Sequence, residues 1–509
     1  MSLTRRPPGW LAANGLVGLL AARVVWLAWA YYFGDGRRYP LESASIALVA
    51  VGFLIVVVRP AHRVSADHGR RIPLMFLPIA IVAAALLYAP AFHLGLLSDD
   101  YVLRAMAGSG NLGVGGGWFF RPVPIALWRL LLAVSDSPLP LHALNIALHG
   151  LNAFLVAVLG YQLGMRLEAA LVGAALFLTF PAAPEAVAWA SGLQDVLLTT
   201  MALGAVIVAS DENSSGWRTA AVCVLVLLAL GSKETAVTVP VLIAICCLSP
   251  ARLRRAREWR LYVSIAAVAA VYGGFRLWVG LGRTGFLAAP SRYFLKQLIT
   301  VAFGSLATPW RTPASSTMSW LAFLTAVALT LLLTHAFLSW RRTDEPFHRA
   351  MRLTLWTVAA VAPVYTYFYV SERLEGARYL YLAECAWALL IADLMRMAAD
   401  RMPRPSPALA CIAAIAIAAS SVTLERELGV WRRAADLRDR VFVQAQASIS
   451  GAGCRTARFD AAPDSVDGAY VFRNGLPEAM GFPGSETARP AAGCEFRWNG
   501  DRFVPAVAR

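Results

Sequence analysis

The chain has 509 residues, of which 58% are hydrophobic and only 15% are charged, and its mean hydropathy is +0.58. This composition excludes a soluble globular protein of this length and predicts a protein that crosses a membrane several times. The formal net charge is +15, but the arginines separate apolar runs and form no basic domain, so no nucleic-acid partner is expected.

Apolar stretches of membrane-spanning length follow one another along most of the chain. They cover residues 9–32, 42–59, 73–96, 141–163, 167–181, 193–210, 217–231, 234–249, 260–280, 318–340, 351–370, 378–397 and 406–424. We therefore predict an all-α membrane protein with about thirteen spans. Residues 1–72 add two N-terminal spans, residues 73–424 form the transmembrane core, and residues 425–509 form a small exported C-terminal α+β tail.

Arginines gather in alternate loops, and short cytoplasmic loops are enriched in such residues. The four clusters are Arg59, Arg63, Arg70 and Arg71; Arg252, Arg254, Arg255, Arg257 and Arg260; Arg341, Arg342, Arg349 and Arg352; and Arg396, Arg401 and Arg404. If these loops are cytoplasmic, the tail and the loops that contain Asp99–Asp100, Glu185, Lys233–Glu234 and Ser371–Tyr379 face outward.

The pair Asp99–Asp100 stands where the apolar run 72–97 ends. Carboxylates beside hydrocarbon are costly and indicate a functional site by default, with a solvated helix end as the plain alternative. The same outer surface collects further carboxylates and cations: Glu185, Asp195, Glu234, Glu372, Arg121, Lys233, Arg292, Arg373 and Arg378. This set suits a site that handles an anion and a proton. A transporter is the alternative class, but its charges are expected near the bilayer midplane on broken helices.

Several motifs occur in a fixed order. They are Ser98-Asp99-Asp100-Tyr101, Phe120-Arg121-Pro122, LHALNIALHGLNA at 141–153, FPAAPEAVAWASG at 180–192 and LGSKETAVTVP at 230–240. Together they resemble the GT-C class of integral-membrane glycosyltransferases, most closely its protein O-mannosyltransferase-like branch with transmembrane and tetratricopeptide repeats. The resemblance covers about residues 90–245, with a weaker echo from Glu372 to Tyr381. Two extra spans precede the acidic loop and no tetratricopeptide array follows, which leaves the acceptor open among protein, lipid and polysaccharide.

The resemblance implies a GT-C-like fold and inverting transfer of a hexosyl or pentosyl group from a polyprenyl-phosphate donor. It implies an acidic residue of this loop, Asp99 or Asp100, as general base; we favour Asp100, with Asp99 orienting it or binding a divalent cation such as Mg²⁺ or Mn²⁺, although the two roles could be reversed. For the departing phosphate, Arg378 is the first candidate, followed by Lys233 and Arg121. The remaining residues that the resemblance marks as supporting the site are Glu185, Glu234, His142, Asn145 and Tyr379. The alternative roles are that Arg121 anchors lipid headgroups, Lys233 pairs with a carboxylate and Arg378 snorkels.

Polar residues repeat every three or four positions within 141–153, namely His142, Asn145, His149 and Asn152, so they share one helix face. Hydrogen bonds between helices are favoured over a metal site there. Cys454 and Cys494 are the two cysteines of the polar tail, and oxidising conditions outside the cell predict a disulfide between them.

These observations predict an enzyme of the bacterial inner membrane, surrounded by lipid, whose active site faces the periplasm or exterior. A transporter or flippase of lipid-linked sugars, or an envelope glycan ligase or polymerase, remains the alternative.

Overall fold

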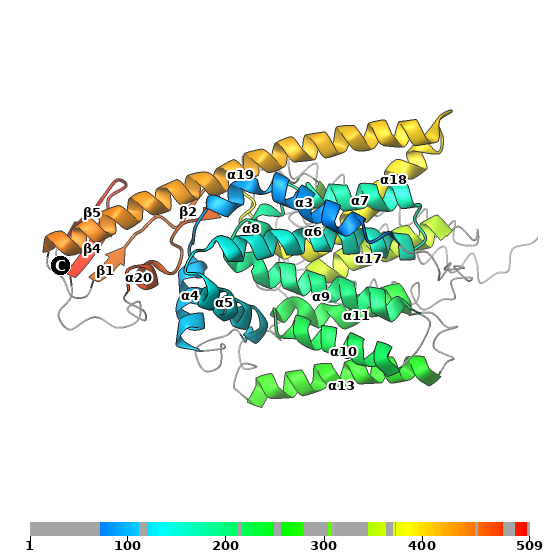
Figure 1. Ribbon diagram of the computed structural model, residues 1–509, viewed down its shortest axis with the longest axis horizontal. Coiled ribbons are helices and arrows are strands. Elements are labelled where there is room, and N and C mark those ends of the chain that lie inside the picture. Colours follow the sequence, from blue (N-terminus) through cyan, green and yellow to red (C-terminus); the bar gives the residue numbers. More distant parts are fainter. Residues whose placement is uncertain are drawn as a thin grey trace, which may run out of the picture.

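The computed structural model describes residues 72–110, 120–211, 216–248, 256–278, 304–307, 309, 345–362, 370–371, 373–452, 457–481 and 494–505. Helices account for 76% of these residues. The helices form one bundle, along which a single long helix runs and continues past one end to a group of short strands (Figure 1). The two N-terminal spans expected at 9–32 and 42–59 lie outside the described residues.

The bundle is built from helices that are apolar over most of their surface, as expected for helices between lipid and protein. They are α3 (Phe76–Leu87), α6 (Leu139–Gln162), α7 (Leu167–Leu178), α9 (Leu193–Ser210), α10 (Gly216–Leu230), α11 (Val239–Cys247), α13 (Ala256–Trp278), α17 (Glu345–Val361) and α18 (Tyr381–Ala399). Helix α6 packs against α3, α7 and α9, and α18 packs against α7 and α17. The core therefore lies around α6, α9 and α18.

Short helices form the loops at one end of the bundle, which we call the loop end; the opposite end is the far end (Figure 1). The short elements there are η1 (Ala89–His93), α4 (Asp99–Ser109), α5 (Pro122–Val134), α8 (Pro184–Val187), η2 (Ala190–Gly192), η3 (Glu234–Thr238) and η6 (Ala377–Leu380). A further short helix, α15, covers Gly304–Ala307. Proline begins α5 and α8, where its missing N–H costs no helical hydrogen bond. Helix α4 ends at Gly110, whose φ of +75° closes the helix in the left-handed region.

Helix α19 (Pro405–Ala452) has 48 residues. At 1.5 Å per residue it is about 72 Å long, more than twice the roughly 30 Å hydrocarbon core of a bilayer. It runs unbroken across residue 425, so the expected start of the tail falls within one continuous helix. The tail then forms β1 (Ala457–Asp460), β2 (Ser465–Val466), β3 (Ala469–Tyr470), α20 (Leu476–Ala479), β4 (Cys494–Trp498) and β5 (Phe503–Pro505).

The strands make two small sheets. Strand β1 pairs in parallel with β4, with Ala457 opposite Cys494, and β4 pairs antiparallel with β5. Strands β2 and β3 form a separate antiparallel pair. Cys494 is disulfide-bonded, whereas the other described cysteines, Cys223, Cys246, Cys247, Cys385 and Cys411, are free. Cys454 lies outside the described residues, so its pairing with Cys494 stays a prediction.

Four described helices are long and apolar enough to cross a membrane: α6, α9 together with the preceding turn, α13 and α19. Helices α3, α5, α7, α10 and α11 are apolar but shorter. The structure thus supports a mostly helical protein with several candidate membrane spans. The count of about thirteen spans goes beyond these four and stays a prediction.

Buried ion pairs close the far end of the bundle. Arg349 pairs with Asp393 of α18 at 2.9 Å and also donates to the Gly164 carbonyl at 3.0 Å. Arg218 pairs with Glu258 at 2.9 Å, where α10 and α13 begin. Because each side chain has its partner, these charges can remain buried.

Glycine permits the close crossing of α3 and α6. A Cβ at Gly150 would lie only 2.6 Å from the Cα of Ile81. We expect Gly150→Ala to separate these helices and to lower the free energy of unfolding by about 1–3 kcal/mol. Thermal unfolding in detergent measures this effect. The control is Gly273→Ala in α13, where a Cβ meets nothing within 4 Å. Equal unfolding temperatures of the two variants would contradict this account of the crossing.

Candidate functional site

The acidic loop reaches the first turn of α4 through a strained residue. Ser98 has a φ of +47°, which is uncommon for a residue other than glycine. Asp100 follows at the start of α4 and is 0% exposed. Its Oδ1 accepts hydrogen bonds from the N–H and the hydroxyl of Ser191, at 2.7 and 2.5 Å, and its Oδ2 accepts one from the Leu97 N–H at 2.8 Å.

The two adjacent carboxyls have different surroundings. Burial raises the pKa of Asp100 to about 7, and the hydrogen bonds from Ser191 and Leu97 offset only part of that effect. Asp99 is partly exposed, and its Oδ1 accepts a 2.6 Å hydrogen bond from the Asn474 amide. Of the pair, Asp100 therefore has the pKa that suits a proton acceptor near neutral pH.

Trp189 links the acidic loop to a partly buried arginine, Arg378. Its indole N–H donates to the Leu97 carbonyl at 3.0 Å, and the Arg378 guanidinium lies 4.6 Å from its ring centroid. Arg378 directly precedes α18 and forms a 3.4 Å ion pair with Glu185 of α8. Its guanidinium also lies near the rings of Tyr379 and Tyr470, at 5.1 and 5.6 Å. Aromatic faces attract a cation without neutralising it.

Glu185 is buried and its carboxyl accepts no hydrogen bond of ordinary geometry from the described residues. Burial raises its pKa to about 7, while Arg378 and the nearby Ala377 backbone favour the charged form. The Glu185 carboxyl thus titrates close to the same pH as Asp100. Its charge partly determines how much positive potential Arg378 presents.

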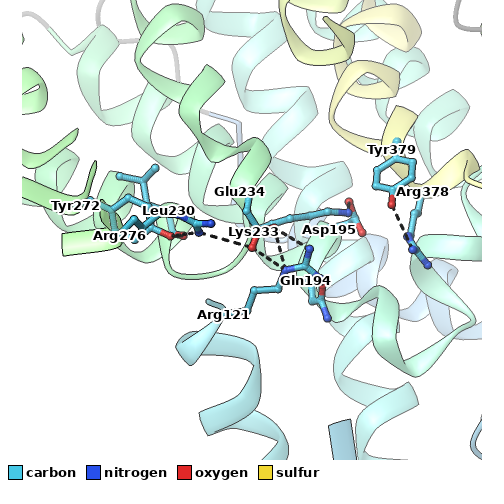
Figure 2. Close-up of polar contacts among 10 residues, drawn as sticks. All are labelled: Arg121, Gln194, Asp195, Leu230, Lys233, Glu234, Tyr272, Arg276, Arg378 and Tyr379. Carbon is cyan, nitrogen blue, oxygen red and sulfur yellow. Dashed lines mark hydrogen bonds and ion pairs between the residues drawn. The ribbon is translucent and has the colours of Figure 1, made fainter. Parts of the chain in front are cut away.

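Lys233 lies at the centre of a second cluster (Figure 2). Its Nζ is 2.5 Å from Asp195 Oδ1 and 4.4 Å from the centroid of the Tyr379 ring. Asp195 is in the first turn of α9 and Lys233 follows the last turn of α10, so each helix dipole favours the charge beside it. Burial lowers the pKa of Lys233 to about 8, although Asp195 opposes the shift.

Arg121 lies on the other side of this cluster and is held tightly (Figure 2). It donates two hydrogen bonds to Glu234, with an ion-pair distance of 2.7 Å, and a third to Gln194. Arg276, near the end of α13, approaches Glu234 to 3.7 Å. Arg121 therefore joins the start of α5 to η3 and to the first turn of α9, and most of its hydrogen-bonding capacity is already used.

The structure thus places the residues of the acidic loop, α8 and the loops before α5, α9 and α18 at the loop end. Among the three cations expected to bind phosphate, Arg378 has the longest ion pair, 3.4 Å against 2.5 Å for Lys233 and 2.7 Å for Arg121. Arg378 is consequently the cation with most capacity to take an anionic ligand. Glu372 and Arg292 lie outside the described residues.

The polar face of α6 bonds to neighbouring segments. His142 Nε2 donates to the Gly95 carbonyl at 3.0 Å, and the Asn145 amide donates to the Trp189 carbonyl at 2.9 Å. His149 and Asn152 both contact the Tyr381 hydroxyl, at 2.7 and 3.3 Å. His149 and Asn152 thus bond between helices, the role favoured from sequence, whereas His142 and Asn145 bond carbonyls of loop residues. His142 and Asn145 bond Gly95 and Trp189, each of which lies two residues before a hydrogen-bond partner of Asp100, Leu97 and Ser191 respectively.

The described residues contain no cluster of three or more His, Cys, Asp or Glu side chains that could hold a metal ion. Asp99 and Asp100 also face different partners, because one bonds Asn474 and the other bonds Ser191. Among the described residues, Asp99 and Asp100 are therefore joined by no third His, Cys, Asp or Glu side chain that could complete a site for a divalent cation.

Sequence analysis missed several residues of this site. Ser191 and Trp189 lie in the quoted 180–192 motif, next to Glu185, but a serine and a tryptophan carry no charge signal. Tyr470 and Arg473 belong to the tail, where no catalytic or phosphate-binding residue was predicted. Only their proximity in the folded chain reveals them.

Comparison of the chain with known protein families, characterised proteins and solved structures found no match. The likeness to GT-C glycosyltransferases therefore remains an inference from the motifs.

Proposed function

We propose that the protein is a membrane glycosyltransferase that moves one sugar from a polyprenyl-phosphate donor to a hydroxyl acceptor with inversion. The observation that carries the proposal is that Trp189 contacts both the loop of a buried carboxyl whose pKa is about 7 and a partly buried arginine: its indole N–H bonds the Leu97 carbonyl in the loop before Asp100, and its ring centroid lies 4.6 Å from the Arg378 guanidinium. Asp100 supplies a base and Arg378 a phosphate ligand, the two groups that such a transfer needs at its opposite ends.

In the proposed reaction, the acceptor oxygen attacks the anomeric carbon of the sugar. The bond from that carbon to the phosphate oxygen breaks, and its electron pair stays on the polyprenyl phosphate. Asp100 takes the proton of the acceptor hydroxyl as the new glycosidic bond forms. Arg378 and Lys233 balance the charge that develops on the phosphate. We propose that the acceptor hydroxyl takes the place of the Ser191 hydroxyl, which bonds Asp100 Oδ1.

The charge distribution supports an enzyme over a flippase. The site residues lie at helix ends and in loops at the loop end, whereas a transporter is expected to hold its charges near the midplane. We further propose a bacterial inner membrane, about thirteen spans and a site on the outer face. Arg349 and Arg396, at the far end, belong to the arginine clusters expected in the cytoplasm, which supports this orientation.

The pH dependence of transfer tests the assignment of the base. Asp100 must be ionised and Lys233 protonated, so we expect kcat/KM to rise as pH passes about 7 and to fall above about 8. The measurement is the initial rate at which polyprenyl phosphate is released from polyprenyl-phosphate hexoses and pentoses. Rates are measured from pH 5 to pH 10, which extends roughly two pH units below and above the expected optimum.

Two variants identify the groups that titrate. Lys233→Arg should remove the alkaline decline, because an arginine stays charged throughout this range. Glu185→Gln should retain the acid limb if Asp100 produces it. Loss of the acid limb in Glu185→Gln would transfer that role to Glu185 and contradict the assignment.

A further inference from the structure

The segment Tyr470–Gly475 of the C-terminal tail is hydrogen-bonded to the acidic loop. The Ser98 N–H donates to the Val471 carbonyl at 2.9 Å, and the Asn474 N–H donates to the Ser98 hydroxyl at 3.3 Å. The Asn474 side chain also donates to Asp99 at 2.6 Å. Two of these bonds involve Ser98 and the third involves the next residue, so the tail helps to maintain the φ of +47° at Ser98.

Aromatic packing extends the contact to both halves of the site. Tyr101, one residue after Asp100, stacks on Phe472 with ring centroids 5.9 Å apart. Tyr470 is buried, and its ring centroid is 4.9 Å from that of Trp189. The same short segment therefore touches the residue after the proposed base and the tryptophan beneath Arg378.

Gly475 is where the tail and the acidic loop approach most tightly. Its φ is +85°, and a Cβ there would overlap the Ser98 carbonyl oxygen and lie 3.1 Å from the Cβ of Tyr101. That carbonyl accepts the Tyr101 N–H at 3.2 Å in the first turn of α4. Any displacement of Ser98 is therefore transmitted directly to the turn that carries Asp100.

Two charged contacts hold the tail against other loops of the site. Arg473 pairs with Glu375, in the loop before η6, at 2.5 Å and with Asp464 of the tail at 2.7 Å. Arg438 of α19 is buried and donates to the Leu96 carbonyl in the acidic loop. The acidic loop is thus hydrogen-bonded both to the tail, through Asn474, and to α19, through Arg438.

We propose that the segment Tyr470–Gly475 positions Asp100 for transfer, with Gly475 as the positioning residue. This inference rests on the proposed function for its catalytic consequence, but the docking itself is independent of any substrate. The tail is then part of the site. The geometry of the base depends on a segment that is distant in sequence, since Asn474 and Asp99 are 375 positions apart.

A matched pair of glycine variants tests the proposal in the full-length protein. Gly475→Ala and Gly481→Ala both place alanine in the left-handed region, at φ values of +85° and +80°. A Cβ at Gly481 meets nothing within 4 Å. The local backbone strain is therefore shared, and only Gly475→Ala pushes against Ser98.

The first readout is hydrogen–deuterium exchange of peptides covering residues 94–103, measured in lipid nanodiscs without substrate. We expect faster exchange in Gly475→Ala and wild-type exchange in Gly481→Ala. The second readout is transfer from polyprenyl-phosphate hexoses and pentoses. There Gly475→Ala should lower kcat by about 10–10²-fold, because a misplaced base loses alignment, and change KM for the donor by less than about twofold.

Equal exchange of residues 94–103 in the two variants, or an equal kcat, would overturn the proposal. If Gly475→Ala does not fold, Asn474→Ala replaces it, with Asn499→Ala as control, since Asn499 bonds only the tail turn at Asp501 and Arg502 in the described contacts. If wild-type protein transfers no sugar, the proposed function fails, but faster exchange in Gly475→Ala still supports the docking of the tail on the acidic loop.

Discussion

Replacing Asp100 with asparagine is expected to reduce sugar transfer by about 10²–10⁴-fold, the usual effect of removing a general base. Asparagine keeps the size of the side chain and can still accept the two Ser191 hydrogen bonds through its carbonyl oxygen. Its amide then faces the Leu97 N–H, which loses its acceptor, at a cost of about 1–3 kcal/mol. Activity should therefore fall far more than stability.

Asp99→Asn is the matched control. The Asp99 carboxyl is partly exposed and bonds Asn474, and we expect this variant to keep most of its activity. Initial rates of transfer and unfolding temperatures of both variants provide the test. Near-wild-type turnover in Asp100→Asn would remove Asp100 as the base. A greater loss in Asp99→Asn than in Asp100→Asn would exchange their roles.

Replacing Arg378 with alanine is expected to raise KM for the polyprenyl-phosphate donor by about 10–10²-fold, because a hydrogen bond to a charged group contributes about 1.5–3 kcal/mol. Arg378→Lys should restore part of the affinity, since lysine keeps the charge but loses the planar fork of donors. KM for the acceptor should change much less. Donor titrations at fixed acceptor concentration measure both effects.

Arg433→Ala is the control for this experiment, because Arg433 also pairs with a carboxylate, Asp467, but lies exposed on α19. Such surface pairs contribute little, so donor KM should be unchanged. An unchanged donor KM in Arg378→Ala would place phosphate recognition elsewhere. Lys233 and then Arg121 would be the next residues to substitute.

Composition and hydropathy were sufficient to predict a mostly helical protein with candidate membrane spans, because a chain that crosses lipid requires long apolar helices with internally bonded backbones. They did not predict that α19 continues unbroken past residue 425, since the polar half of that helix lacks the apolar signal of a span. Helix α7, with 12 residues, also shows that an apolar stretch need not form a helix of spanning length.

The charged residues of the site could be predicted from the sequence, because charges are rare in this chain and those next to apolar runs are easily recognised. Asp100, Arg378 and Lys233 stand out because a buried charge near a membrane needs a partner. Their pairing could not be predicted, because Lys233 with Asp195, Arg121 with Glu234 and Arg378 with Glu185 depend on how the helices pack. Tyr470 and Gly475 were missed for the same reason, since short tail strands give no sign of which loop they contact.

The most direct test of the central claim is mass spectrometry of the envelope glycans and polyprenyl-phosphate sugars of a strain that lacks this protein. The strain is complemented with the wild type or with Asp100→Asn, each expressed at the same level. A membrane glycosyltransferase predicts that one sugar substituent is missing from the deletion strain, returns with the wild type and stays missing with Asp100→Asn, while the lipid-linked donor accumulates. Full restoration by Asp100→Asn, or identical glycans in all strains, would contradict the claim.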